Sequence, residues 1–364
     1  MASTHSLGRL TFAIDGDHPG AGQLRAEFPR QATTTPDIGF RFVDRLPGLD
    51  NPRTTDFGEA SQVAYRVGAG RITYQVTRRT NRWDVAIVAT PGRSIPPLVQ
   101  RLRNFNYLSR DELIAKSVIY GPMDHLAHIA GLDRGQSLAH ASSVARDGRG
   151  VALFAEGGVG KTSTALKLVL EHGWSLLGDD LAVLADDGTI HAHPKRMQIY
   201  AYNLAGDPVL RHRLLSSRSP IDRLHFEYHA RRYGPKSSRR RVSAEQLLGP
   251  GRTANQATLA LAVLLRRIDS GDLRAHELDR EHVVEEITRV ILHEIDPYRP
   301  VLAGLEALGI TTILPSESAL ATRTSAVIRS ALAQARVLEV SVPPSTVPAQ
   351  VVGILQSHLD SALS

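Results

Sequence analysis

Residues 155–162, Ala-Glu-Gly-Gly-Val-Gly-Lys-Thr, form a glycine-rich run that ends in Lys161 and Thr162. An apolar segment (151–154) precedes the run and a helix-forming segment follows it, which is the context that a phosphate-binding loop requires. Glycines let backbone N–H groups approach phosphate oxygens closely, and the start of a helix adds partial positive charge there. We expect Lys161 to reach the β- and γ-phosphates and the Thr162 hydroxyl to hold Mg²⁺.

The run predicts a binding site for ATP, or another nucleoside triphosphate, together with Mg²⁺. Alanine stands at the usual first glycine, and a tight strand-to-helix turn without a ligand is the alternative. The expected nucleotide-binding residues are Glu156, Gly157, Gly158, Val159, Gly160, Lys161, Thr162 and Ser163.

Two adjacent carboxylates, Asp179 and Asp180, follow the apolar residues 174–177. This pattern places the pair at the carboxyl end of a strand beside the phosphate-binding loop. Phosphoryl transfer needs one carboxylate to orient Mg²⁺ and, for a hydroxyl acceptor, another to take its proton. Adjacent carboxylates at a strand end can divide these two tasks. A surface turn is the alternative interpretation.

The elements around these residues predict two domains in the 364-residue chain. Residues 1–133 are expected to form a strand-rich α+β domain that contributes to acceptor binding. Its expected strands are short, closely spaced and typical of an antiparallel sheet, and a capping box at Ser109–Glu112 begins a helix that Gly121-Pro122 should break. The expected strands are Arg9–Ile14, Ile38–Val43, Gln62–Val67, Arg71–Val76 and Arg82–Ala89.

Residues 134–364 are expected to form an α/β domain of the P-loop type with a C-terminal helical extension. Lys161–His172 reads as a helix, and Ala257–Leu265 as a buried central strand because it is apolar throughout. Further expected strands are Ser137–Ala145, Gly150–Ala155, Ser175–Gly178, Leu181–Leu184, Thr189–His193, Gly309–Leu314 and Val337–Val342. The polar, arginine-rich segment Pro208–Pro250 shows irregular apolar spacing.

The motifs together resemble the catalytic domain of HPr kinase/phosphorylase and its relatives. His140 lies 21 residues before Lys161, and a short helix separates the loop from the Gly173–Asp180 segment that ends in the acidic pair. The resemblance covers 137–200. It implies a P-loop fold of the phosphoenolpyruvate-carboxykinase-like kind and transfer of phosphate to a seryl-type hydroxyl.

By this resemblance, Asp179 would be the base, Asp180 would assist Mg²⁺ and His140 would lie near the transferred phosphate. The family's metal-binding glutamate and its downstream glycine-rich signature are not recognisable, and residues 193–200, His-Pro-Lys-Arg-Met-Gln-Ile-Tyr, stand in their place. The resemblance therefore implies a divergent kinase, similar to the HPr-kinase-like enzymes found beside biosynthetic pathways. Its acceptor would be a hydroxyl of a small molecule, an amino acid or a peptide.

Two other functions fit the loop. A ParA/MinD-like nucleotide-dependent switch ATPase has a similar loop but carries a lysine where this chain has Glu156. A non-catalytic nucleotide-binding module is the other alternative to a kinase.

The basic segment Arg231–Arg241 fits a phosphate lid, an acidic-substrate dock or a solvated loop. Although the net charge is +6, we expect no nucleic-acid partner, because the segment has few aromatic residues.

The composition narrows the remaining possibilities. The chain has no cysteine, which excludes disulfides and thiolate chemistry. Residues 1–12 lack the pattern of a signal peptide, and no stretch of 18 apolar residues occurs, so we expect a cytoplasmic protein without a membrane partner. A homo-oligomer is compatible with the sequence.

Overall fold

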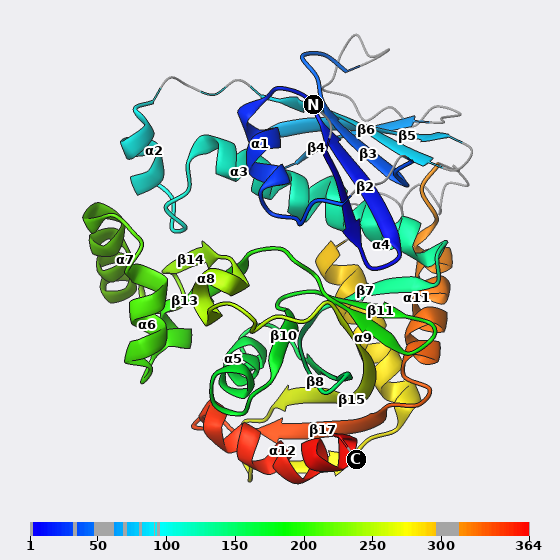
Figure 1. Ribbon diagram of the computed structural model, residues 1–364, viewed down its shortest axis with the longest axis vertical. Helices are drawn as coiled ribbons and strands as arrows, with labels where there is room; N and C mark the ends of the chain where they lie inside the picture. Colours follow the sequence, from blue (N-terminus) through cyan, green and yellow to red (C-terminus); the bar gives the residue numbers. More distant parts are fainter. Residues whose placement is uncertain are drawn as a thin grey trace. The chain divides into compact units, whose positions relative to one another are not determined.

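The computed structural model describes residues 3–31, 35–46, 62–67, 71–79, 82–90, 92, 95–295 and 313–363. The structure is mixed α/β (Figure 1). It divides into two compact units, of which unit 1 comprises 1–97, 109–138 and 288–327, and unit 2 comprises 98–108, 139–287 and 328–364. Helices α9 (Arg280–Ile295) and α11 (Glu317–Ala331) each run from one unit into the other. The units are thus interleaved along the chain, whereas the sequence suggests two consecutive segments.

The described strands of unit 1 form one sheet in the order β1-β2-β3-β6-β5-β4. The hairpins β1–β2, β4–β5 and β5–β6 are antiparallel, but β3 pairs in parallel with both β2 and β6. The expectation of an antiparallel sheet is therefore wrong for its centre, because α1 (Pro19–Arg25) returns the chain to the start of β3. The strands are Ser3–Leu7 (β1), Leu10–Asp15 (β2), Ile38–Phe42 (β3), Gln62–Val67 (β4), Ile72–Arg79 (β5) and Arg82–Ala89 (β6).

Side-chain alternation gives this sheet one apolar face and one polar face. On β6, Trp83, Val85 and Ile87 are buried, while Asp84 and Ala86 between them are half-exposed. A strand places successive side chains on opposite faces, so this pattern buries one face only. Helices α1, α3 (Arg110–Val118) and α4 (Asp124–Leu132) cover the apolar face (Figure 1).

The predicted helix signals in unit 1 are confirmed. The Ser109 side chain accepts a hydrogen bond from the Glu112 N–H, and the Glu112 side chain bonds the Ser109 N–H, which completes the capping box that begins α3. The helix is interrupted at η1 (Ile119–Met123), where Gly121 leaves helical geometry next to Pro122. Helix α2 (Pro97–Leu102) and strand β7 (Gln136–Ala139) lie at changes from unit 1 to unit 2.

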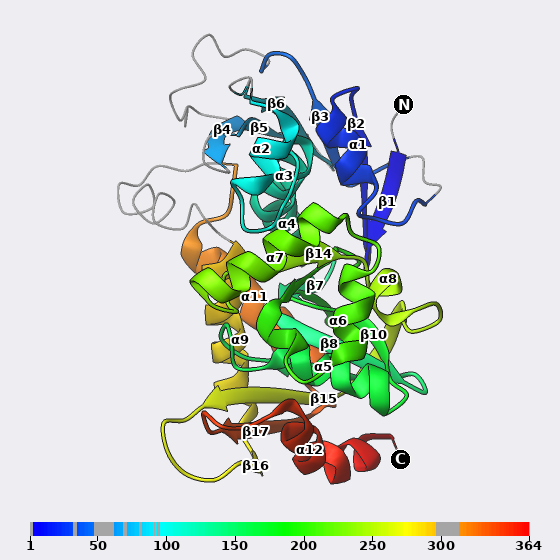
Figure 2. The same cartoon turned by 90° about the vertical axis from the view of Figure 1, so that its left-hand side faces the viewer.

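The central sheet of unit 2 contains strands in the order β10-β8-β9-β15-β12-β11. The long strand β15 pairs in parallel with β9 and with β17, and β17 also pairs with β16 (Figure 2). The strands are Ala141–Arg146 (β8), Arg149–Phe154 (β9), Ser175–Gly178 (β10), Ala182–Ala185 (β11), Thr189–His191 (β12), Gln256–Arg267 (β15), Arg274–Glu277 (β16) and Arg336–Val342 (β17).

Helices cover this sheet on both faces. On one face, α5 (Lys161–Glu171) and α12 (Pro348–Leu363) pack with β9 and β15, and residues such as Leu168 and Leu355 are fully buried. On the other face, the part of α9 before Thr288 and the end of α11 bury residues such as Val284 and Ile328. The apolar run of β15 is therefore covered on both sides, as its sequence predicts.

The arginine-rich segment Pro208–Pro250, whose apolar spacing is irregular in the sequence, forms regular secondary structure. It contains α6 (Pro208–Leu215), α7 (Pro220–Tyr233), β14 (Arg239–Val242) and α8 (Ala244–Leu248), and β14 pairs with β13 (Met197–Tyr200). The basic segment is not a solvated loop throughout, because Arg240 is fully buried and its Nε lies 2.6 Å from Asp222 Oδ1. Most of the expected strand Gly309–Leu314 lies outside the described residues. Within the described part of the chain, every helix is too short or too polar to cross a bilayer.

Candidate functional site

The phosphate-binding loop expected from the sequence connects β9 to α5. Gly158 and Gly160 have φ values of +82° and +118°, which only glycine adopts readily. A Cβ atom on Gly157, Gly158 or Gly160 would meet nothing within 4 Å, so open space lies beside the loop. Gly160 is the N-cap residue of α5 and brings no side chain to the N–H groups of the first helical turn. Those N–H groups and the open space form a cradle for an anion.

The Lys161 side chain contacts the backbone of this loop. Its side chain is largely buried, and Nζ donates to the Ala155 carbonyl at 2.6 Å and to the Glu156 carbonyl at 3.3 Å. The ammonium is therefore held against the backbone of the loop. Phosphate oxygens in the cradle would compete for the same donors.

Asp179, the first residue of the acidic pair, is hydrogen-bonded to the start of α5. Its Oδ1 accepts hydrogen bonds from Thr162 Oγ1 at 2.8 Å and from Ser142 Oγ at 2.5 Å. Asp179 follows β10, and β8 separates β10 from β9, so its strand is one position further from the loop than the sequence suggests. Burial raises the pKa of Asp179, and the hydrogen bond from Ser142 partly offsets this effect.

Asp180 has different partners from its neighbour. Its Oδ2 lies 2.8 Å from Lys195 Nζ, and its Oδ1 lies 3.8 Å from His140 Nδ1. A φ of +75° turns the backbone at Asp180. Burial alone would raise the pKa of Asp180, but the charge of Lys195, followed by that of His140, brings it to about 2. The structure therefore pairs Thr162 with Asp179 and pairs Asp180 with Lys195.

The two histidines near the acidic pair are neutral at pH 7. His140 lies between β7 and β8, and burial, followed by the charge of Lys161, lowers its pKa to about 4. His193 is buried, and desolvation and the charge of Lys195 lower its pKa to about 3. The cationic groups at the site include Lys161, Lys195 and Arg267, whose Nη2 donates to the Gly158 carbonyl of the loop at 3.1 Å.

The structure brings together most of the residues expected at the site. Lys161, Thr162, Asp179, Asp180 and His140 all belong to unit 2 and are linked by hydrogen bonds or by charge. The expected Ser163 lies beside Thr162, and its Oγ accepts a hydrogen bond from Asn203 Nδ2 at 2.9 Å.

Sequence reasoning assigned no role to Ser142, Lys195 or Asn203. Ser142 and Asn203 carry no signal, because serine and asparagine have many structural uses and their partners are distant in the chain. Lys195 does carry a signal in the sequence, because the chain has only five lysines and its other Lys/Arg residues are arginines. Its side chain is 1% exposed. A buried lysine needs a carboxylate partner, and Asp180 is that partner.

The described residues contain no group of three His, Asp or Glu side chains able to hold a metal ion by themselves. Mg²⁺ does not need such a group in nucleotide sites, where one or two carboxylates share it with phosphates and water. The Thr162 hydroxyl beside the Asp179-Asp180 pair supplies oxygen ligands of this kind. The residues present therefore fit a nucleotide-associated Mg²⁺.

We compared the chain with known proteins. It matches no family model, and no curated protein matches it. Among solved structures, the HPr(Ser) kinase/phosphatase from Coxiella burnetii aligns with 63% of this chain and 99% of its own chain, at 12% sequence identity and a TM-score of 0.29. We therefore infer the chemistry of the site from its own residues.

Proposed function

We propose that this chain is a kinase that transfers the γ-phosphate of ATP, or of another nucleoside triphosphate, to a hydroxyl group. The observation that carries the proposal is the hydrogen bond from Thr162 to Asp179. Thr162 belongs to the phosphate cradle, and Asp179 is a buried carboxylate with a raised pKa. A group that can take a proton therefore lies in direct contact with the element that would hold the phosphates.

The cradle would position the nucleotide. Open space lies beside Gly157, Gly158 and Gly160 at the start of α5, and Lys161 Nζ lies at the same loop. Fixed donors of this kind stabilise the charge on a transferring phosphoryl group without reorganisation. We assign nucleotide binding to Glu156–Ser163, with Lys161 as the cation nearest the phosphates.

The acidic pair would divide two tasks, because its members have pKa values shifted in opposite directions. A raised pKa suits a proton acceptor, and a pKa of about 2 keeps a carboxylate ionised as a metal-holding group requires. Both hydroxyls that bond Asp179 bond Oδ1, so Oδ2 is the oxygen that we assign to the acceptor's proton.

In this scheme the acceptor oxygen forms a bond to the γ-phosphorus while the bond to the β–γ bridging oxygen breaks. The acceptor's proton passes to Asp179 Oδ2, and the nucleoside diphosphate leaves. We assign Mg²⁺ to Thr162 and Asp180, where it would neutralise phosphate charge. Lys195 keeps Asp180 ionised and oriented, and His140 would supply a neutral imidazole beside the phosphates.

The proposal agrees with the resemblance of 137–200 to HPr-kinase-like domains, which suggests a seryl-type acceptor. The test is incubation with γ-labelled ATP, Mg²⁺ and a panel of acceptors that includes free serine, hydroxyl-bearing metabolites and serine-containing peptides. The labelled product is identified by its mass. We expect label on one acceptor class, and on none in the Lys161→Ala variant.

Two outcomes would contradict the proposal. Release of labelled inorganic phosphate with nucleotide-dependent self-association, and no labelled acceptor, would favour a switch ATPase. Binding of ATP·Mg in calorimetry without any turnover would favour a nucleotide-binding module.

A further inference from the structure

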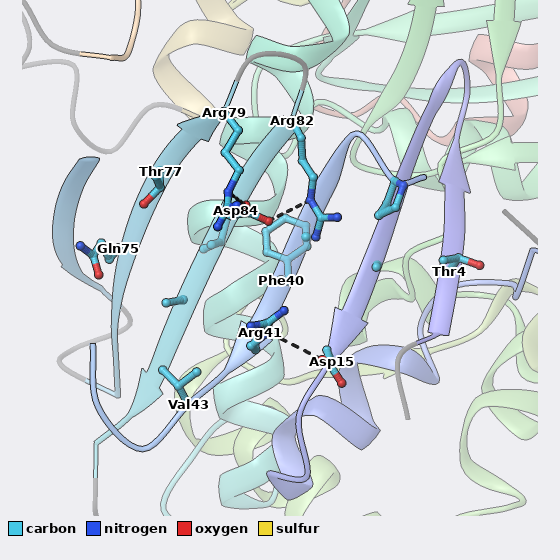
Figure 3. Close-up of a pocket in the computed structure, with 15 residues that line it drawn as sticks. Thr4, Asp15, Phe40, Arg41, Val43, Gln75, Thr77, Arg79, Arg82 and Asp84 are labelled. Atoms are coloured by element: carbon cyan, nitrogen blue, oxygen red, sulfur yellow. Dashed lines mark ion pairs between the residues drawn. The ribbon is translucent and has the colours of Figure 1, made fainter. Parts of the chain in front are cut away.

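The polar face of the unit 1 sheet carries a hollow of about 700 Å³ (Figure 3). Its lining comes from strands β1, β2, β3, β5 and β6 and from the neighbouring residues Pro36 and Val43, and every lining residue belongs to unit 1. A volume of this size falls within the ~300–1,000 Å³ range of small-molecule sites. The residues assigned to the proposed kinase function belong to unit 2, and none of them lines this hollow.

Small residues make the centre of the sheet face hollow. In the register of the sheet, Ala13 on β2 lies opposite Gly39 on β3, and Gly39 lies opposite Asp84 on β6. A Cβ atom on Gly39 would lie 2.3 Å from Arg82 Nη2 and 3.1 Å from Asp84 Oδ1. The glycine therefore leaves the space in which the Arg82 guanidinium crosses the neighbouring strand.

Three arginines and two aspartates line the hollow, which gives it a positive excess. Arg79 Nε lies 2.7 Å from Asp84 Oδ2, and Arg82 Nε lies 2.8 Å from Asp84 Oδ1, so one carboxylate serves two guanidiniums. Arg41 Nε lies 3.7 Å from Asp15 Oδ2, a looser contact. Figure 3 shows these two groups at opposite ends of the hollow.

The aspartates use only part of the bonding capacity of these arginines. A guanidinium carries five N–H donors, and a carboxylate shared by two of them orients both without occupying all their donors. Arg41 and Arg79 are 66% and 74% exposed at the rim, whereas Arg82 and Asp84 lie deeper. Thr77 adds a hydroxyl beside Asp84.

We propose that this hollow binds an oxyanion, either a carboxylate or a phosphate, carried on a small organic body. The arginine forks at the rim would hold the oxyanion in two-point contacts. The organic body would lie over the small central residues Ala13, Gly39 and Ala86. Asp15 and Asp84 would hold the guanidiniums in place.

The experiment is calorimetry on the full chain with two probes, succinate for the carboxylate source and glycerol phosphate for the phosphate source. All proteins carry Lys161→Ala, which weakens phosphate binding at the cradle of unit 2. In this background we expect saturable binding of at least one probe. Arg41→Gln and Arg79→Gln should each raise its Kd about tenfold or more, because each removes a charge-assisted contact.

Arg30→Gln is the matched control, because Arg30 is exposed in unit 1 but does not line the hollow. Its Kd should stay within about twofold of the background protein. Because Arg41 and Arg79 lie at the rim, their replacement should leave the fold intact, which thermal unfolding checks. The absence of saturable binding of both probes, or equal Kd values in the Arg41, Arg79 and Arg30 variants, would overturn the proposal.

Discussion

Thr162 and Asp179 lie 17 residues apart in the chain, and Thr162 Oγ1 donates a hydrogen bond of 2.8 Å to Asp179 Oδ1. The contact joins the start of α5 to the end of β10 although β8 separates β10 from the strand that enters the loop. It brings the proposed proton acceptor to the element that would position the nucleotide. The proposed phosphate transfer depends on this contact.

Lys161→Ala should lower nucleotide affinity and abolish transfer. A hydrogen bond to a charged group contributes about 1.5–3 kcal/mol, so the Kd for ATP·Mg should rise roughly 10- to 150-fold. Calorimetry measures the Kd, and the labelled-product assay measures transfer. Lys167→Ala is the control, because Lys167 lies on the same helix and pairs with Glu171 instead. Equal losses in the two variants would contradict the role of Lys161.

Ser142→Ala should move the pH profile of transfer to higher pH. The Ser142 hydroxyl donates to Asp179 and lowers its pKa, so its removal raises that pKa further. The base must be ionised to accept a proton, and activity is therefore lost at a higher pH as the solution is acidified. The acidic limb of kcat/KM against pH measures the shift. Ser143→Ala is the control, since Ser143 Oγ has no hydrogen-bond partner among the described residues. A shift of equal size in both variants would count against the assignment of Asp179 as the base.

His128 should make unit 1 less stable in acid. It is buried, Thr324 and the Leu138 N–H bond its ring, and burial lowers its pKa to about 3. Above the ordinary pKa of 6.5 both folded and unfolded forms are neutral. Between pH 6.5 and pH 3 only the unfolded form takes up a proton. The free energy of unfolding therefore decreases as the pH is lowered through this range, by on the order of a few kcal/mol.

The His128→Gln variant tests this linkage. It should unfold at a lower temperature than the parent at pH 7.5 but lose less stability between pH 7.5 and pH 5. Replacement of the exposed His212 by Gln should leave the parent's pH dependence unchanged. Parallel pH curves for the parent and His128→Gln would show that His128 does not titrate as described.

Arg240→Met should destabilise unit 2 by about 3–5 kcal/mol, because it leaves the buried carboxylate of Asp222 without its closest cation. Chemical denaturation measures the loss. Arg231→Met is the control, since Arg231 is exposed at the end of α7. A loss below about 1 kcal/mol would indicate that Arg218, which also pairs with Asp222, compensates.

The sequence predicts the elements of the site well because their signals are local. The helix expected to begin at Lys161 and the strand expected at Ser175–Gly178 both occur, since glycines and apolar runs mark their ends. The parallel centre of the unit 1 sheet could not be predicted, because strand direction depends on connections rather than on alternation. The interleaved units depend on contacts between segments far apart in the chain.

The interaction partners of the charged side chains could not be predicted from the sequence either. Arg240 belongs to a basic run for which a solvated loop is one of three interpretations of the sequence, yet its side chain is buried and paired with Asp222. The carboxylates Asp179 and Asp180 are chemically identical in the sequence. In the structure, burial raises the pKa of Asp179, whereas the charge of Lys195 outweighs burial and lowers the pKa of Asp180.

The most direct measurement compares the parent with Asp179→Asn for both ATP·Mg binding and phosphate transfer. Asp147→Asn is the control, because Asp147 lies in an exposed turn with a φ of +51° that asparagine tolerates. We predict that Asp179→Asn binds ATP·Mg with a Kd close to that of the parent and transfers no label, while Asp147→Asn does both normally. Full turnover by Asp179→Asn would contradict the assignment of Asp179 as the group that takes the acceptor's proton.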